Sequence, residues 1–321
     1  MTTVTHSSQP RSGLLTGRAR PGDRIFSGAA VAAGVLILVV LAAVAIFLIV
    51  EAIPALSAQQ GDFSSPDTTS FWQYVAPFAF GTIWAAFLAL LMAVPVAIGI
   101  ALFISHYAPR RLAHSLGYIV DLLAAVPSVV YGLWGITVLA PLLQPFYVQL
   151  SAALGWIPLF AGPVSGTGRT ILTVAIVLAV MVLPIITALC REVFLQTPRL
   201  REEAALALGA TRWEMVRMTV LPFGRPGIIS AAMLGLGRAL GETMAVAMVL
   251  SPAAIISFAL LQSQNPNTIA ANIALNFPEA SGIGVNVLIG TGLVLFVITL
   301  VVNMIARAIV ARFAEFSGAN E

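Results

Sequence analysis

The chain has 321 residues, of which 59% are hydrophobic and only 9% charged, whereas a soluble globular protein is roughly 45 to 50% apolar and about 25% charged. A soluble enzyme is therefore excluded, and a polytopic membrane protein is expected. All 16 basic residues are arginine, so the chain lacks a Walker A lysine and cannot by itself be a standard ATPase. The net charge of +3, the single cysteine and the three scattered histidines predict no nucleic-acid partner, no disulfide and no metal or cofactor in this chain.

Six apolar stretches reach the length of about 20 residues that a spanning helix needs. They cover residues 28–50, 78–104, 117–142, 170–190, 227–250 and 284–306. The first stretch follows several arginines, as a signal sequence would, but it is longer than the roughly 7 to 15 apolar residues of that element, which favours a retained anchor. The expected organisation is a disordered tail (1–22), a membrane domain (23–316) and a short second tail (317–321).

Arginine is concentrated on one side of these spans. Apart from Arg169 and Arg238, every arginine precedes the first span, follows the second, lies between the fourth and fifth, or follows the sixth. Because positive charge near helix ends is retained in the cytoplasm, both termini and both tails are predicted to be cytoplasmic. The excess of positive charge therefore reflects the orientation of the chain in the membrane.

The longest predicted cytoplasmic connection, residues 191–225, has the pattern of a helical hairpin. Residues 197–208 combine a Thr-Pro helix start with strong helix formers, and Gly209 can end that helix. Thr211 begins a capping box, Thr-Arg-Trp-Glu, which predicts a second helix reaching Pro222.

This hairpin resembles the EAA loop of permease subunits of bacterial ABC importers, whose pattern is E-A-A, three residues, G, nine residues, I-x-L-P. The only departure in this chain is Thr219 in place of isoleucine. The resemblance implies a coupling element that docks into a separate ATPase subunit. The residues that would carry this coupling are Glu203, Ala204, Ala205, Gly209, Leu221 and Pro222. An ordinary hairpin at the membrane surface remains the alternative.

Two charged residues occur inside the fifth predicted span. Arg238 lies 12 residues after Pro226, about 18 Å along a helix, and is therefore expected near the middle of the bilayer. Glu242 follows four residues later, so the two side chains are predicted to share a helix face and neutralise each other. One interpretation is a structural ion pair. The other places Arg238, Glu242 and Thr243 on the substrate pathway, because a charge inside the bilayer should face protein or water and arginine binds oxyanions well. A carboxylate can also accept a hydrogen bond from the O–H of protonated phosphate, whereas sulfate at neutral pH has no O–H.

Glycine flanks this pair of charges. Gly237 and Gly241 form a G-x-x-x-G pattern, which predicts close packing of another helix beside the two charged residues.

Three segments resemble the phosphate-specific permeases of the PstC type: Gly237-Arg-Ala-Leu-Gly-Glu-Thr-Met-Ala-Val246, Gly22–Phe26 and Val126–Gly135. The resemblance implies an all-α polytopic permease of about six transmembrane helices, with the type I (MetI-like) importer architecture. It also implies a bacterial plasma (inner) membrane location in lipid, a homologous PstA-like subunit, two PstB-like ATPases that bind ATP and Mg, and a PstS-like phosphate-binding protein. The chain itself would be non-catalytic.

Three further readings remain open at this stage. An ABC permease for another oxyanion, sulfate or molybdate, would share the architecture. An ion-coupled secondary transporter would leave the EAA-like loop unexplained. A role in reporting phosphate status would be compatible with transport.

Overall fold

The computed structural model describes residues 21–63 and 68–318. The predicted tail 1–22 lies outside the described residues except for Pro21 and Gly22, which begin the first helix. Of the predicted tail 317–321, Ser317 and Gly318 belong to the last helix, and the remainder lies outside the described residues.

The described residues are mostly helical. The α-helices are α1 (Pro21–Ala52), α2 (Phe71–Leu102), α3 (Arg110–Ala124), α4 (Ser128–Trp134), α5 (Ala140–Leu154), α6 (Ile171–Leu195), α7 (Arg199–Ala207), α8 (Arg212–Met215), α9 (Leu221–Leu240), α10 (Met244–Val249), α11 (Ile269–Asn276) and α12 (Ile283–Gly318). Short 3₁₀ turns cover Pro54–Ser57 and Phe277–Glu279, π-helical turns cover Phe103–Tyr107, Gly135–Leu139 and Val216–Val220, and strands β1 (Pro252–Ala253) and β2 (Asn265–Pro266) pair in parallel.

The chain divides into two units, Met1–Phe47 and Leu48–Glu321. The first contains most of α1, an apolar helix of 32 residues, about 48 Å long and therefore sufficient to span a bilayer. The second unit contains all the other helices and strands.

Six helical segments of the described chain are long and apolar enough to cross a membrane, which confirms the predicted number. They are Ile25–Ser57, Phe71–Tyr107, Ser128–Leu154, Ile171–Leu195, Arg212–Leu240 and Ile283–Ala311. The predicted all-α polytopic fold is confirmed as well.

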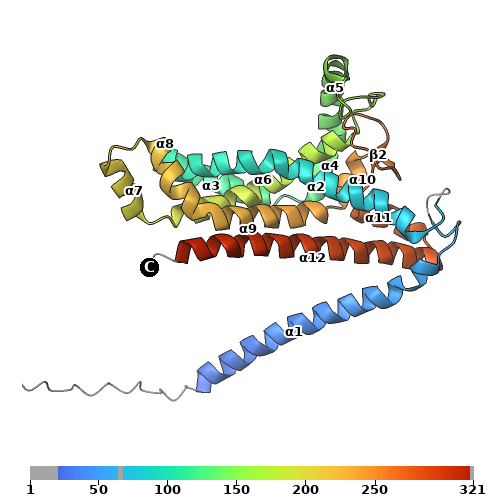
Figure 1. Ribbon diagram of the computed structural model, residues 1–321, viewed down its shortest axis with the longest axis horizontal. Coiled ribbons are helices and arrows are strands. Elements are labelled where there is room, and N and C mark those ends of the chain that lie inside the picture. Colours follow the sequence, from blue (N-terminus) through green and yellow to red (C-terminus); the bar gives the residue numbers. More distant parts are fainter. Residues whose placement is uncertain (1–20, 64–67, 319–321) are drawn as a thin grey trace, which may run out of the picture. The chain divides into compact units, whose positions relative to one another are not determined.

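The core of the second unit is centred on α6, which packs between α2 and α9 (Figure 1). Helix α2 meets it with a stripe of small side chains at every fourth position: Ala85, Ala89, Ala93, Ala97 and Ala101, all 0 or 1% exposed. Small residues let helix backbones approach closely, which strengthens van der Waals packing where lipid provides no hydrophobic driving force. The apolar composition of both helices thus produces a tight membrane core.

The third predicted span, 117–142, is wrong. The helix ends at Ala124 and a new one begins at Ser128, with Pro127 in an extended conformation before it. Proline disfavours a helical conformation at the preceding residue and cannot donate a backbone hydrogen bond, so the helix breaks instead of bending. The apolar span is Ser128–Leu154, and α3 is a separate helix that packs against α6.

The fifth predicted span, 227–250, is not one continuous helix. Helix α9 ends at Leu240, and α10 begins only at Met244. The helix that includes α9 also begins earlier than predicted, since Arg212–Leu240 is a single apolar helical segment. The chain therefore breaks beside both predicted charges.

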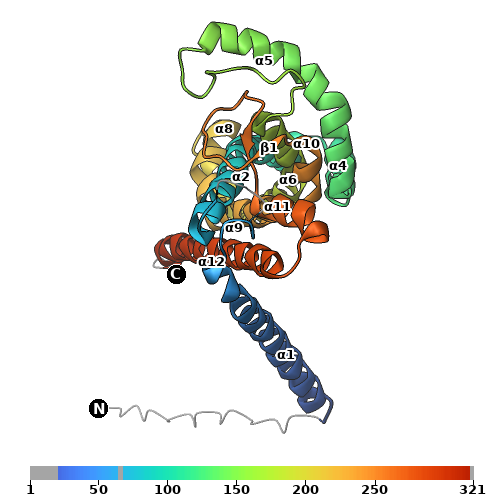
Figure 2. The same ribbon diagram turned by 90° about the vertical axis from the view of Figure 1, so that its right-hand side faces the viewer.

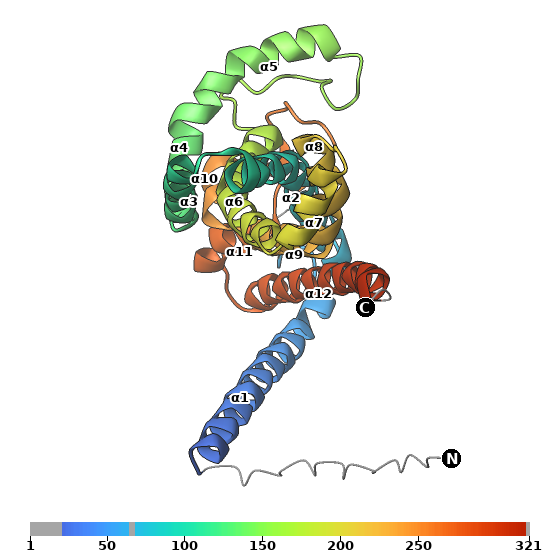
Figure 3. The same cartoon turned by 90° about the vertical axis from the view of Figure 1, so that its left-hand side faces the viewer.

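The two ends of the second unit differ in structure. Helices α7 and α8 lie at one end, hereafter the α7 end, and Figure 3 shows them nearest the viewer. At the opposite end, Figure 2 shows α5 extending away from the helices around α6, next to the loop that carries β1. Tyr147 ties α5 back to this core, because its hydroxyl lies 2.8 Å from Oγ1 of Thr173 on α6.

Candidate functional site

The break between α9 and α10 places two opposite charges at two helix ends. Arg238 lies in the last turn of α9, where a cation is favoured by the negative end of the helix dipole. Glu242 is only 8% exposed, and its Oε1 accepts a hydrogen bond of 3.0 Å from the backbone N–H of Ala245 in the first turn of α10. Each charge is thus stabilised by its own helix end.

The predicted neutralisation of Arg238 by Glu242 is not observed. Among the residues that the structure describes, the only contact between a basic and an acidic side chain within 4 Å is His106 with Glu202. The predicted shared face required a continuous helix, and the helix ends before Glu242. Within this described part, the guanidinium of Arg238 makes no hydrogen bond, and the second oxygen of Glu242, Oε2, accepts none. The cation is therefore unpaired among these residues, whereas the carboxylate is buried.

Thr243 follows the break, and its hydroxyl group points back toward Gly241. Oγ1 donates to the carbonyl oxygen of Gly241 at 3.2 Å. Its predicted contact with substrate remains a prediction.

The predicted close contact at Gly237 and Gly241 is not made by any helix among residues 21–63 and 68–318. A Cβ atom added at Gly237 would meet nothing within 4 Å, and one at Gly241 would meet only the carbonyl of Gly237, at 3.6 Å. The close approach of α9 to α6 occurs instead at Gly235, whose added Cβ would lie 2.7 Å from Ile186. The two predicted glycines are exposed, so packing against another subunit remains a prediction for them.

The close helix contact beside the break involves α4. A Cβ at Gly132 would lie 2.9 Å from Cα of Ala245, and one at Gly135 would lie 2.8 Å from Val249, so α4 and the π-helical turn that follows it both touch α10. The hydroxyl of Tyr131 donates to the carbonyl of Leu123 at 3.0 Å and so links α4 to α3. The Val126–Gly135 segment therefore supports the short helix whose first turn Glu242 caps.

Arg169 is a structural residue that sequence reasoning did not identify. Its guanidinium donates to the carbonyl oxygens of Met248, Val249 and Leu250 at 3.3, 3.3 and 2.9 Å, which are the last carbonyls of α10 and its C-cap. Such carbonyls lack helical partners, so the cation satisfies them and complements the helix dipole. The available signal was that Arg169 is the only arginine in the loops predicted on its side of the membrane.

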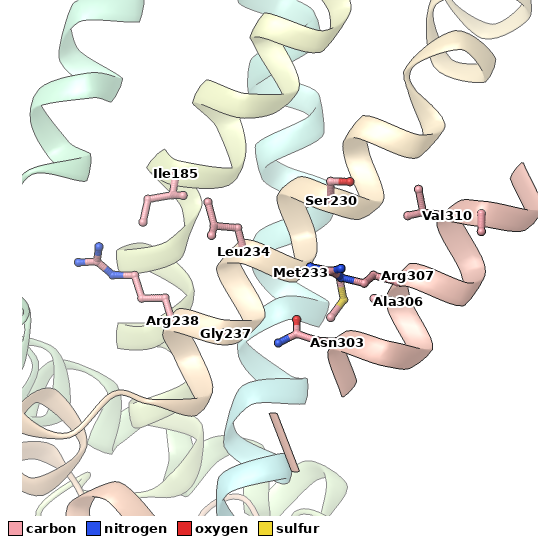
Figure 4. A pocket seen from close by; sticks show the side chains of 11 residues that line it. Ile185, Ser230, Met233, Leu234, Gly237, Arg238, Asn303, Ala306, Arg307 and Val310 are labelled. Atoms are coloured by element: carbon pink, nitrogen blue, oxygen red, sulfur yellow. The ribbon is translucent and has the colours of Figure 1, made fainter. Parts of the chain in front are cut away.

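A groove of about 750 Å³ opens beside Arg238, between α9 and α12 (Figure 4). We call it the α9–α12 groove. Its lining residues come from α6, α9 and α12: Ile185, Ser230, Met233, Leu234, Gly237, Arg238, Asn303, Ala306, Arg307, Val310 and Ala311. The groove is mainly apolar, but it contains two arginines and no carboxylate, so its charge suits an anion.

The coupling hairpin has the predicted local structure. Helix α7 begins at Arg199 with Pro198 as its N-cap, one residue later than the predicted Thr-Pro start, and Gly209 turns the chain with φ of +87°, a conformation that favours glycine. The Thr211 capping box is present: the backbone N–H of Thr211 donates to Oε2 of Glu214 at 2.8 Å, and that of Glu214 donates to Oγ1 of Thr211 at 3.3 Å. The second helix does not end at Pro222 but continues through a π-helical turn into α9.

The hairpin presents an exposed surface at the α7 end. No residue of α7 is buried; Glu203 and Ala204 are exposed and Ala205 is half-buried. Leu208 beside Gly209 is 89% exposed, which is costly in water but suits a partner cleft. Leu221 and Pro222 are half-buried at the start of α9, so they are placed to fix the base of the hairpin, away from its tip.

One contact joins α7 to a membrane helix. Nε2 of His106, in the π-helical turn that follows α2, lies 3.4 Å from Oε1 of Glu202. The other ring nitrogen, Nδ1, lies 2.7 Å from Oγ of Ser105, which holds the orientation of the imidazole. Movement of α7 can therefore be transmitted to α2 as well as to α9.

Comparison with known proteins places these features in a family. Residues 93–315 match the family described as "Binding-protein-dependent transport system inner membrane component". The chain is 50% identical over 304 residues to a Mycobacterium tuberculosis protein named "Phosphate transport system permease protein PstC 2", covering 91% of this chain and 92% of that protein. Proteins named "Phosphate transport system permease protein PstC" from Mycobacterium leprae (50% identity, 83% and 86% covered) and Mesorhizobium japonicum (41% identity, 92% and 92% covered) are also similar.

Solved structures share the fold. The chain resembles a permease chain of a bacterial ABC transporter that imports the polysaccharide alginate, with a TM-score of 0.61, 18% identity, and 91% of this chain and 96% of that chain covered. A structure of a bacterial alginate ABC transporter with a pentasaccharide-bound periplasmic protein gives a TM-score of 0.55 at 18% identity, with 74% and 78% covered. The predicted type I importer permease architecture is confirmed by this likeness.

Proposed function

Because the chain belongs to the binding-protein-dependent transport system inner membrane component family, and within it to the PstC permeases, we propose that it is the membrane-spanning subunit through which an ATP-driven importer moves inorganic phosphate into the cytoplasm. Permeases of this family are typically non-catalytic. The family match and the named relatives support this role over an ion-coupled secondary transporter.

The observation that carries the proposal is the position of Arg238 and Glu242 on either side of the α9/α10 break. Arg238 presents a guanidinium with no hydrogen-bond partner among the described residues, and a guanidinium can donate two parallel hydrogen bonds to an oxyanion. Oε2 of Glu242 can accept the O–H of a protonated phosphate, whereas sulfate at neutral pH has no such donor. Together the two groups favour phosphate over sulfate.

The coupling hairpin supports the proposed partners. Its exposed apolar tip at Leu208, next to the left-handed Gly209, fits a cleft on an ATPase subunit, and α9 links that tip directly to Arg238. The complex would contain a homologous PstA-like permease, two PstB-like ATPases that bind ATP and Mg, and a PstS-like binding protein. The α7 end would face the cytoplasm of a bacterium, with both termini on that side of the inner membrane and lipid around the spans.

Arg238→Gln tests the pathway role in proteoliposomes that contain the whole complex. The side chain remains polar but loses its charge, so phosphate uptake is expected to fall at least roughly tenfold, as for loss of a charge-assisted hydrogen bond. Arg110→Gln is the matched control, because Arg110 is exposed at the start of α3, away from the break. Equal uptake by Arg238→Gln and wild type, at equal membrane content, would exclude the pathway role.

The choice of anion is tested separately. ATP hydrolysis by the wild-type complex is measured with a binding protein loaded with phosphate or with sulfate. Stimulation by the phosphate-loaded protein supports the proposal. Stimulation by the sulfate-loaded protein alone would make the chain a permease for that other oxyanion.

A further inference from the structure

The α9–α12 groove continues from Arg238 toward the α7 end. Figure 4 shows Arg307 reaching from α12 toward Met233 on α9, whereas Arg238 extends from α9 on the side away from α12. Met233 is five residues before Arg238, about 7 Å along the helix, on the side of the start of α9. Arg307 is therefore a second cation, displaced from the first toward the proposed cytoplasmic side.

Asn303 lies beside Arg307 on the same face of α12. Asn303 is four residues earlier on α12 and lines the same groove, so its amide lies on the same face as the guanidinium. Both side chains are exposed, and within the described chain neither has a hydrogen-bond or ion-pair partner. Guanidinium and amide N–H groups are donors that suit phosphate oxygens.

Ser230 also lines the groove, but its hydroxyl already donates a hydrogen bond within its own helix. Oγ of Ser230 donates to the carbonyl oxygen of Pro226 at 2.9 Å, so its only hydrogen is used within α9. The donors that remain open to an anion on this side of Arg238 are those of Arg307 and Asn303. The surrounding walls, including Met233, Leu234 and Val310, are apolar and offer no further hydrogen bonds.

We propose that Arg307 and Asn303 form a second phosphate contact, which receives the anion after Arg238 and guides it toward the cytoplasm. This inference rests on the proposed function and adds two residues to its pathway. Few donors among apolar walls make a contact that attracts the anion without trapping it, which conduction requires. A phospholipid headgroup has the same phosphate chemistry, so the experiment must separate the two sources.

The test uses the full complex in proteoliposomes with the phosphate-loaded binding protein. Arg307→Gln is expected to lower the maximal uptake rate roughly tenfold. The concentration of binding protein that gives half-maximal uptake should stay unchanged, because docking does not involve the groove. Arg307→Lys should recover part of the rate, since it restores the charge without the planar fork. Asn303→Leu should reduce the rate by a smaller factor, and Arg110→Gln, at the exposed start of α3, should leave it unchanged.

Lipid composition distinguishes free phosphate from a headgroup. In vesicles of neutral phosphatidylcholine alone, wild type should keep its advantage over Arg307→Gln. If wild type falls to the rate of Arg307→Gln when anionic lipid is omitted, the groove binds a headgroup and the inference is overturned. It is also overturned if Arg307→Gln matches wild type while Arg238→Gln is inactive, a result that leaves the proposed function intact. Failure of wild type itself to transport phosphate would instead overturn the proposed function.

Discussion

Nη2 of Arg169 donates a hydrogen bond of 2.9 Å to the carbonyl oxygen of Leu250, and this contact joins the start of α6 to the end of α10. The opposite end of the same short helix is held by Glu242 through the N–H of Ala245. A helix of six residues is too short to be stable alone, because nucleation is costly. Its position therefore depends on the charged side chains at its two ends and on its packing with α4.

Arg169→Gln is expected to destabilise the complex, because three backbone carbonyls lose a charged donor. The cost should be about 2 to 3 kcal/mol, in the range for hydrogen bonds to charged groups. Thermal unfolding in detergent measures it, with Arg110→Gln as the control for loss of an exposed arginine. An unfolding temperature equal to that of wild type would show that the end of α10 does not need this cation.

Breaking the contact between His106 and Glu202 should weaken the link between the hairpin and α2. We expect Glu202→Gln to raise the ATP hydrolysed per phosphate transported, because α7 then moves with less effect on the membrane helices. A double-mutant cycle with His106→Gln should give a coupling energy of about 0.5 to 1 kcal/mol, since residues in contact are not additive. Additive effects of the two substitutions would contradict a direct link.

The carboxylate control for this cycle is Glu192→Gln, on an exposed residue of α6. Within the described chain the carboxylate of Glu192 has no hydrogen bond or ion pair. Its substitution should leave the ratio of ATP to phosphate unchanged.

Gly132→Ala should disturb the contact between α4 and α10. Its methyl group would lie 2.9 Å from the backbone of Ala245, too close without a shift, and such overpacking costs about 1 to 3 kcal/mol. Gly99→Ala is the matched control, because an added Cβ there meets nothing within 4 Å. Unfolding of the two variants in detergent should lower the midpoint only for Gly132→Ala; equal midpoints would contradict the close contact.

Gly209→Val should uncouple ATP hydrolysis from transport or release the ATPase. A β-branched residue is strained at φ of +87°, so the hairpin tip would change its conformation. Gly209→Asn tolerates the left-handed region better and should retain most coupling. Co-purification of the ATPase and the ratio of ATP to phosphate measure both variants, and normal coupling in Gly209→Val would count against a docking role for this turn.

Local signals accounted for the coupling hairpin. Gly209, Thr211 and Glu214 act over three to five neighbouring residues, so their turn and capping box follow from the order of residues alone. The spans followed from hydropathy in the same way, because about 20 apolar residues are required wherever a helix crosses lipid. Their number was predicted correctly, although two predicted spans are broken in the structure and the ends of the other four differ by one to seven residues.

Hydropathy cannot detect the breaks inside apolar segments. The segments 117–142 and 227–250 are apolar throughout most of their length, but the first breaks before Pro127 and the second after Leu240. The second break also separated Arg238 from Glu242, because the expected i,i+4 pairing holds only within one helix. The predicted pairing of these two charges was therefore wrong, and their place on the substrate pathway stays a prediction.

The amino-acid sequence by itself determined the apolar membrane character, the number of spans, the helical hairpin around Gly209 and the family resemblance, because composition and short-range spacing are properties of the chain order. Only the tertiary structure decided which distant residues contact α10 and which residues line the groove beside Arg238. Arg169 reaches the end of α10 from some 80 positions away, Gly132 brings α4 against that helix, and Arg307 shares a groove with Arg238. These relationships arise from packing between distant segments, which no local pattern specifies.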